Sequence, residues 1–362
     1  MKKKGLIITL AIIVLLAVAA FVLHRMYGQS ATYDDDFYIE DTSTITKIYI
    51  ADKLDNQVLL TRVPNDTTWM VNDQYEASQP LVRSLLGTLN TMRIRNRVNK
   101  AAAKNEVKLL AGKSTKVEIY QNVYRIDWFN HHWQFFPHEK LTNTYYVGHE
   151  TQDLLGTIML REGDKWPVVV HIPGFRGFVG PQFITNPLLW RSHRIVDLPV
   201  SKIERIELNI PAVPSESFAI CREGEGFYME MLENHQRVDG FDTARVAQFL
   251  SSFTNLNFDE YAAAVPKTEL DTTFSKPPRT ILRIKDTEGN EHVLKTYLKY
   301  NNPDDIINMP DPEMYEVFDL DRLYAVLDDK DTVLIQYFVF DNILQHASFF
   351  RGAAINNPTI QH

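Results

Sequence analysis

The residues best suited to chemistry lie in the segment DWFNHHWQFFPHEK, residues 127–140. It contains three histidines, His131, His132 and His138, and the carboxylate of Glu139 follows them. Imidazole nitrogens and carboxylate oxygens are common zinc ligands, so the segment suggests a metal-dependent enzyme. Whether these groups can share one ion depends on their spacing.

The spacing argues against a shared ion. VYRIDWF and WQFF predict two strands, with NHH at the turn between them and His138 just past the second strand. His132 and His138 are six residues apart, about 20 Å in an extended chain. No two of the three histidines have the i, i+4 spacing of a helical ligand pair, so zinc would need ligands from elsewhere, such as His149, His171 or His193. We therefore expect polar loop histidines, no metal and no cofactor.

A second candidate is the loop HIPGFRGFVGP, residues 171–181. Gly174 after Pro173 suits a type II turn, which needs positive φ at its third position. The loop contains neither GxxxxGK[ST] nor a GxGxxG between a strand and a helix, the two glycine patterns that bind phosphate. The loop is either a tight turn that joins two domains or a docking surface, because aromatic residues and arginine are favoured at interface centres. The docking surface would consist of Phe175, Arg176, Phe178, Trp190 and Arg191.

Signatures of a catalytic nucleophile are lacking. The chain contains neither GxSxG nor SxxK. Its one cysteine, Cys221, permits no intramolecular disulfide and no cysteine-based metal cage, and it lies in a predicted strand, where a lone thiol is typically buried. The enzyme question stays open and leans towards no. The alternative function is an envelope hydrolase or metal-dependent enzyme with a site between two units.

The N-terminus predicts a membrane anchor. MKKK precedes residues 5–23, which are 19 residues without a charge. As a helix they extend about 28 Å, enough to cross a bilayer core, and they are longer than the apolar region of a cleaved signal peptide. AVAA and GQSA nevertheless leave cleavage open. Three lysines before the segment and only Arg25 after it place the N-terminus in the cytoplasm. We expect a single-pass protein of a bacterial inner membrane, with most of the chain in the periplasm.

The charge composition limits the kinds of partner that the protein can bind. The formal net charge is −8 over 362 residues, and no basic run occurs outside the extreme N-terminus. Binding to nucleic acid requires a basic face, so nucleic acid is not an expected partner. The expected partners are the membrane, through residues 5–23, and other envelope or transporter proteins.

One order of elements occurs twice. After an acidic linker, apolar alternation at Ile45, Ile48 and Ile50 and then at Val58, Leu60 and Trp69 predicts antiparallel strands. A helix follows, with Ser78 as N-cap and an apolar stripe at Leu81, Leu85, Leu86, Leu89 and Met92. About 158 residues later, SKIERIELNI begins the same order, with Phe227 in place of Trp69. Asp242 is then the N-cap, and the stripe consists of Val246, Phe249, Leu250 and Phe253.

This order predicts an α+β protein made of two tandem, duplicated units. Each unit has a mostly antiparallel sheet and one main helix, and both follow an N-terminal transmembrane helix. The expected divisions are a tail and anchor in residues 1–27, a linker in 28–44, a first unit in 45–198 and a second in 199–362. Around residues 320–327, near many carboxylates, we expect a short helix.

The chain also resembles a known family. NTYYVG, T-x-D-x-L-G-T, HIPGF-x-G and the WR pair, all within residues 142–208, are similar to the bacterial domain-of-unknown-function family four-three-four-zero, in the form common in Bacteroidetes. The resemblance implies a membrane-anchored envelope protein, in some cases encoded beside transporter components linked to gliding motility. It implies no activity. We expect a non-enzymatic binding or scaffold component of an envelope or transporter-associated complex.

Overall fold

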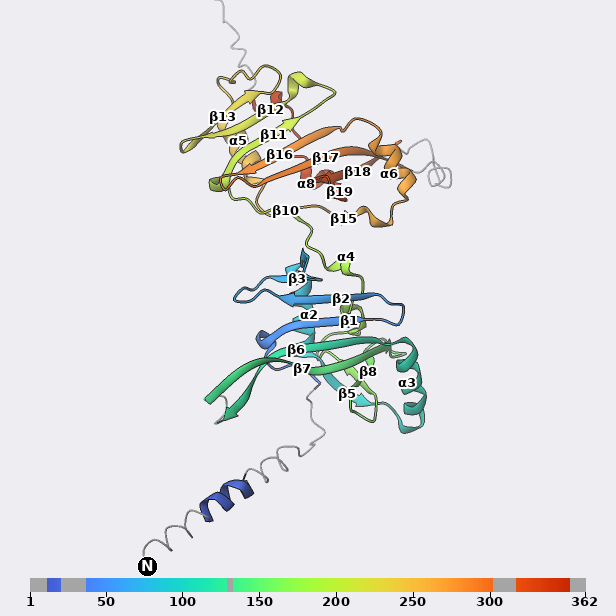
Figure 1. The fold of residues 1–362 in the computed structure, drawn as a ribbon. Coiled ribbons are helices and arrows are strands. Elements are labelled where there is room, and N and C mark those ends of the chain that lie inside the picture. The colour runs from blue at the N-terminus through green and yellow to red at the C-terminus, as the bar shows by residue number, and fades with distance from the viewer. Residues whose placement is uncertain (1–11, 21–36, 129–132, 302–316, 352–362) are drawn as a thin grey trace, which may run out of the picture. The chain divides into compact units, whose positions relative to one another are not determined.

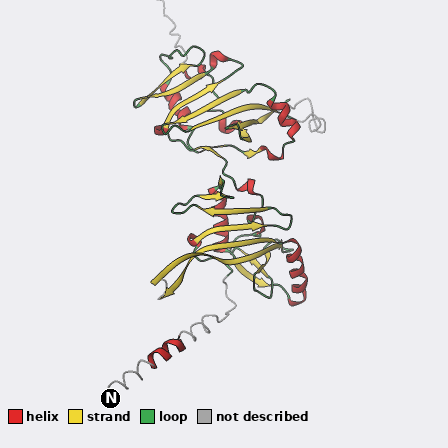
Figure 2. Cartoon of the chain, in the orientation of Figure 1, coloured by secondary structure: helices red, strands yellow, loops and turns green. Residues whose placement is uncertain are grey.

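The computed structural model describes residues 12–20, 37–128, 133–301 and 317–351 (Figure 1). By internal contacts the chain divides into two compact units, residues 1–192 and 193–362. The sequence pattern placed this boundary between residues 198 and 199. Each unit is built on one large sheet, and all strand pairs in the described ranges are antiparallel (Figure 2). The fold class is therefore α+β, as expected.

Unit 1 has a nine-stranded sheet in the order β4-β3-β2-β1-β6-β7-β8-β9-β5. Its strands are β1 (Ile45–Ala51), β2 (Gln57–Arg62), β3 (Trp69–Val71), β4 (Tyr75–Glu76), β5 (Arg93–Arg97), β6 (Thr115–Trp128), β7 (Trp133–Glu150), β8 (Thr157–Arg161) and β9 (Val168–His171). Its helices are α2 (Gln79–Thr91), α3 (Lys100–Lys113) and α4 (Pro187–Trp190), with 3₁₀ turns η1 (Thr42–Thr44) and η2 (Gly180–Gln182).

Unit 2 has an eight-stranded sheet in the order β13-β12-β11-β16-β17-β18-β19-β15, beside a small β10-β14 pair. The strands are β10 (Arg194–Val196), β11 (Ile203–Asn209), β12 (Phe218–Glu223), β13 (Gly226–Met231), β14 (Leu256–Asn257), β15 (Glu260–Tyr261), β16 (Thr280–Asp286), β17 (Glu291–Tyr300), β18 (Phe318–Leu327) and β19 (Asp331–Gln336). The helical elements are α5 (Thr243–Ser251), α6 (Lys267–Phe274), α8 (Tyr337–Phe340), α9 (Ala347–Phe350), η3 (Val200–Lys202), η4 (Pro214–Glu216) and η5 (Ala262–Ala264).

The two sheets have the same topology. Apart from the extra strand β4, each strand of unit 1 has an equivalent at the same place in the sheet of unit 2. In sheet order, the equivalents of β3-β2-β1-β6-β7-β8-β9-β5 are β13-β12-β11-β16-β17-β18-β19-β15. The offset of 158 residues also relates η1 to η3. The register shift after Ile45 recurs after Ile203, at the same offset. The repeat expected from the sequence is therefore present in local detail.

In each unit, helices pack on both faces of the sheet. In unit 1, Leu85 and Leu89 of α2 belong to the main core, whereas Leu110 of α3 packs with Val169 in a separate cluster. Successive strand residues point to opposite faces, so a strand such as β9 is buried on both sides. In unit 2, α5 lies on the main core and α6 on the smaller cluster. The expectation of one main helix per unit was wrong, because each sheet needs a second helix to cover its other face.

The apolar stripes are confirmed with one exception. Val246, Phe249, Leu250 and Phe253 are all buried. In α2, Leu81 is 37% exposed and Val82 is buried in its place. The short helix expected around residues 320–327 is instead strand β18.

The expected anchor, residues 5–23, lies mostly outside the described ranges, and residues 12–20 of it form a helix. Across the residues that the structure describes, no helix is long and apolar enough to cross a membrane.

Candidate functional site

The loop after β9 has the turn that the sequence predicts. Gly174 has φ of 80°, and the Phe175 amide donates to the Ile172 carbonyl at 3.1 Å, which closes a β-turn with Pro173 at its second position. The ring of Phe175 lies over Gly177, where an added Cβ would come within 2.5 Å of it. The positive φ favours glycine at position 174, whereas a side chain at position 177 would displace the exposed ring of Phe175.

The far end of this loop is fixed to the sheet. Thr157 is fully buried, and its Oγ1 accepts hydrogen bonds from the amides of Val179 at 2.9 Å and Gly180 at 3.2 Å. Between these two fixed points Phe175 is 56% exposed, Arg176 is exposed and Phe178 is half-buried. The loop thus presents an aromatic ring and a guanidinium on a constrained backbone.

Trp190 and Arg191 have different surroundings. Trp190 is 1% exposed in the core of unit 1, and its indole donates to the Ile184 carbonyl at 2.9 Å. The guanidinium of Arg191 lies 3.8 Å from the centre of the Tyr75 ring. Because its ring is enclosed, Trp190 stabilises unit 1 and offers a partner no surface, so it has no part in the docking surface proposed below.

Of the weak metal candidates, His131 and His132 lie outside the described residues. His138 lies within β7, paired with Val123, so its expected place beyond the strand was wrong. Glu139 accepts from Lys47 at 2.6 Å and from Thr46 at 2.7 Å, and these contacts hold the pKa of its carboxyl below the ordinary value. Within the described ranges no three His, Cys, Asp or Glu side chains are placed to hold a metal ion.

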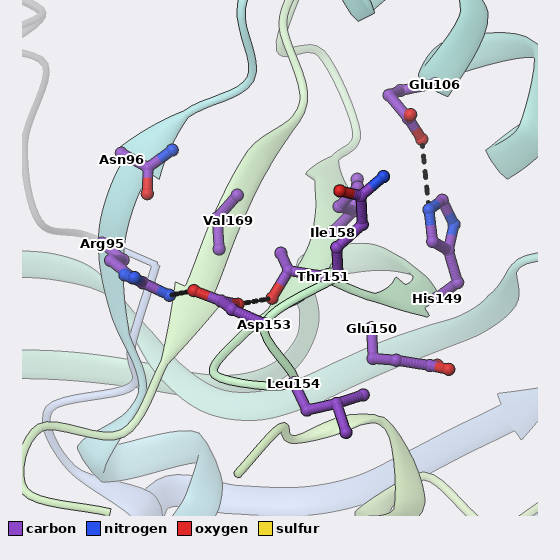
Figure 3. Close-up of a pocket in the computed structure, with 11 residues that line it drawn as sticks. Arg95, Asn96, Glu106, His149, Glu150, Thr151, Asp153, Leu154, Ile158 and Val169 are labelled. Carbon is purple, nitrogen blue, oxygen red and sulfur yellow. Dashed lines mark hydrogen bonds and ion pairs between the residues drawn. The ribbon is translucent and has the colours of Figure 1, made fainter. Parts of the chain in front are cut away.

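Unit 1 contains an open pocket of about 710 Å³ that the sequence did not predict (Figure 3). It is lined by residues of β5, α3, the end of β7, the β7–β8 turn, β8 and β9. His149 Nε2 lies 3.6 Å from the Glu106 carboxylate, an ion pair when the imidazole is protonated. On the opposite wall Arg95 donates to Asp153 at 2.8 Å. The pocket offers charged groups of both signs, already arranged in pairs.

The pKa of the Asp153 carboxyl is strongly lowered. Its carboxylate accepts from Thr151 Oγ1, from the Leu155 amide at 3.1 Å and from Arg95. These hydrogen bonds, Thr151 first, lower the pKa of Asp153 to about 2. Such a group stays ionised at neutral pH and is a poor proton donor or acceptor there, so Asp153 organises its turn and does not suit acid–base chemistry.

The motif T-x-D-x-L-G-T, residues 151–157, has a structural explanation. Thr151 and Asp153 form the β7–β8 turn, and Thr157 holds the loop after β9. A Cβ added to Gly156 would come within 2.5 Å of Val169. The sequence showed this motif as a sign of the family, but its role in supporting the Phe175 loop required the long-range contact of Thr157.

Exposed aromatic residues gather on the β6–β7 hairpin. β1 pairs with β6 only as far as Gln121, and beyond it β6 and β7 continue as a two-stranded ribbon (Figure 1). Trp133, Phe135 and Phe136 are 56%, 52% and 66% exposed. Sequence reasoning treated this segment as a question about its histidines and assigned no role to its rings.

Comparison with known proteins gives one match. A family model described as "Domain of unknown function (DUF4340)" matches residues 69–277, from β3 in unit 1 to just past α6 in unit 2. The match confirms the resemblance inferred from the motifs. No curated protein and no solved structure matches the chain significantly.

Proposed function

Given that the chain belongs to the DUF4340 family, a domain of unknown function, we propose that it is a membrane-anchored, non-enzymatic binding or scaffold component of a bacterial envelope or transporter-associated complex. The proposal has two parts, an anchor at the N-terminus and a docking surface on unit 1. We also propose that the two units arose by duplication, for which the common strand order is the support.

The anchor proposal rests on residues 5–23. They carry no charge, and the described part, residues 12–20, is helical with its large apolar side chains exposed. Leu15 and Leu16 are 72% and 62% exposed. A helix that is apolar on all sides is stable only where another apolar medium surrounds it, and a bilayer supplies that medium. On this proposal the N-terminus is cytoplasmic and both units are periplasmic.

The docking proposal rests on the constrained loop at Phe175 and Arg176. Exposing a large ring to water is unfavourable, and nothing in the turn requires an aromatic residue at that position. The turn and the Thr157 contacts fix the loop before any partner binds, which lowers the entropy lost on binding. Aromatic and arginine side chains carry much of the binding energy at protein interfaces. We therefore assign Phe175 and Arg176 as the centre of the surface, with the half-buried Phe178 of the same loop as a further member.

The test is crosslinking in intact cells with full-length protein tagged at the C-terminus, followed by mass spectrometry of the proteins recovered. We expect one or two specific envelope or transporter proteins with the wild type and their loss in F175A/R176A. The matched control is K165A/W166A, which removes a cation and a ring from the β8–β9 connection, where Trp166 is 41% exposed. Equal loss in both variants, or no specific protein with the wild type, contradicts the docking proposal.

A further inference from the structure

The β6–β7 hairpin of unit 1 has an aromatic arm that the corresponding, fully described β16–β17 hairpin of unit 2 lacks. The pair Tyr120↔Leu141 in unit 1 corresponds to Lys285↔Glu291 in unit 2, because β6 and β16 occupy the same place in their sheets. The described residues 121–128 and 133–140 therefore stand where unit 2 has only residues 286–290, with the sequence DTEGN. We call residues 121–128 and 133–140 the aromatic arm. The corresponding turn in unit 2 shows that the fold does not require it.

The arm has one predominantly apolar face. Ile126 pairs with Phe135, Tyr124 with Pro137, and Trp128 with Trp133. Directly paired residues and alternate residues of a strand share a face, so Tyr124, Ile126, Trp133 and Phe135 lie on the same side of the ribbon. The opposite side carries the polar residues Arg125 and Gln134 together with Phe136, which has φ of 60° and is 66% exposed. Tyr124, Trp133 and Phe135 are 37%, 56% and 52% exposed, so unit 1 leaves this face uncovered.

The base of the arm lies beside the entry of the chain into unit 1. Ile45, the first residue of β1, pairs with Gln121, and the Gln121 amide group donates to Thr44 Oγ1 at 2.7 Å. Glu139 on the other strand binds Thr46 and Lys47. Both strands of the arm are thus held against the residues that follow the linker from the proposed anchor.

The dimensions allow the arm to reach the bilayer. Residues 24–36, between the apolar segment and Phe37, extend at most about 45 Å. The ribbon from Gln121 to Trp128 extends about 23 Å at 3.3 Å per residue. The arm carries two Lys/Arg and two Asp/Glu residues on a chain with net charge −8, so it brings no net negative charge towards anionic lipids. Tryptophan and tyrosine favour the interface between headgroups and acyl chains.

We propose that the aromatic arm is a second membrane contact, with Tyr124, Ile126, Trp133 and Phe135 seated in the interface of the bilayer that holds residues 5–23. This inference rests on the anchor in the proposed function. With two attachments, the anchor and the arm, unit 1 is held at a set height and orientation above the lipid surface.

The test is quenching of tryptophan emission in full-length protein reconstituted into vesicles of phosphatidylcholine with brominated acyl chains. The chain has five tryptophans, of which Trp69 and Trp190 are buried. We expect bromolipid to quench the wild type relative to unbrominated vesicles, and most of this quenching to be lost in W128F/W133F. The matched control is W166F, which removes an exposed ring outside the arm and should keep the quenching.

Flotation separates failure of the arm from failure of the anchor. If the protein floats with vesicles but W128F/W133F is quenched like the wild type, the arm is not in the bilayer and the anchor stands. If the protein does not float, both proposals fail. In a third outcome, crosslinking in vesicles gives dimers and the tryptophans are not quenched. The arm would then bind a second copy of the chain. Replacing residues 121–140 by DTEGN, the unit 2 turn, would abolish such dimers, and this outcome also overturns the membrane contact.

Discussion

The two units share a frame and differ in what is attached to it. Both have the order β3-β2-β1-β6-β7-β8-β9-β5 or its equivalent, and both carry helices on both faces of the sheet. In unit 1 the β6–β7 hairpin extends into the aromatic arm, whereas in unit 2 the corresponding hairpin closes in a polar turn. What recurs is needed for folding, and what occurs once is the better candidate for function.

Recurrence extends to single side chains. Arg62 lies over the ring of Trp69 at 5.1 Å, and Arg222 lies over the ring of Phe227 at 4.7 Å. Arg62 donates to the carbonyls of Ser43 and Thr42 in η1, and Arg222 donates to those of Val200 and Ile203 at the corresponding turn. Trp69 and Phe227, which the sequence indicated as equivalent residues, are therefore the aromatic members of two equivalent arginine–aromatic pairs.

The ends of the units also correspond. The Ser78 amide donates to the Trp190 carbonyl at 2.7 Å, and the Asp242 amide donates to the Phe350 carbonyl at 2.7 Å. Isolated bridges follow next to each, Ala77↔Arg191 and Phe241↔Arg351. The WR pair thus has a counterpart in Phe350 and Arg351, and its role is to close a unit.

The largest loss of stability is expected on removing the buried aromatic residues that close the two units. We predict that W190A and F350A each lower the free energy of unfolding by about 3–5 kcal/mol, because each removes a large ring from a closed core. Urea unfolding, with hydrogen exchange to locate the loss in unit 1 or unit 2, measures it. If one variant costs less than about 1 kcal/mol, the two closures are not energetically equivalent.

Removing the arginine of either arginine–aromatic pair should cause the next largest loss of stability. R62A and R222A should each cost about 1.5–3 kcal/mol, since each leaves backbone carbonyls without a charged donor. R62K and R222K keep the charge but lose the forked geometry, and we expect them to recover only part of the loss. The measurement is the urea midpoint of each variant. Full recovery by lysine would show that charge alone, without the fork, stabilises these turns.

The helix caps should distinguish the units. Asp242 Oδ1 accepts from the amides of Ala244 and Arg245, at 3.0 Å and 3.1 Å, whereas Ser78 makes no side-chain capping hydrogen bond. D242A should therefore cost about 0.5–2 kcal/mol, and S78A should be close to neutral. Thermal unfolding of the two variants side by side tests this, and equal losses would contradict it.

The smallest effect concerns two surface turns. Hydrogen bonds from Thr151 and from Asn290 lower the pKa values of Asp153 and Asp286 below their ordinary value of 3.8. A depressed carboxyl pKa adds stability above its unfolded value, and this stability is lost as the pH falls through the folded value, for Asp153 between about 3.8 and about 2. T151A should raise the pKa of Asp153, and N290A that of Asp286, each without affecting the other. Carboxyl NMR titration measures both, and an unmoved Asp153 in T151A would assign the shift to Arg95 and the Leu155 amide.

Two errors of the sequence interpretation have opposite causes. The run LYAV in β18 was assigned to a helix, but Leu323 and Ala325 face the main core while Tyr324 faces the α6 cluster. A strand buried on both faces loses its alternation, so its pattern cannot be distinguished from that of a buried helix. Helix α3 was missed for the opposite reason, since only Ala103 and Leu110 of it are buried and its apolar stripe is weak.

The sequence by itself determined the fold class, the repeat at 158 residues, the turn at Gly174 and the family, because these depend on local periodicity, on backbone preferences of single residues and on contiguous motifs. Only the tertiary structure decided which side chains are enclosed and which are presented. Trp190 and Phe175 are both large aromatics near the end of unit 1, yet one is 1% exposed and the other 56%. That difference arises from strands and helices distant in sequence that cover one ring and leave the other in solvent, and no local pattern encodes it.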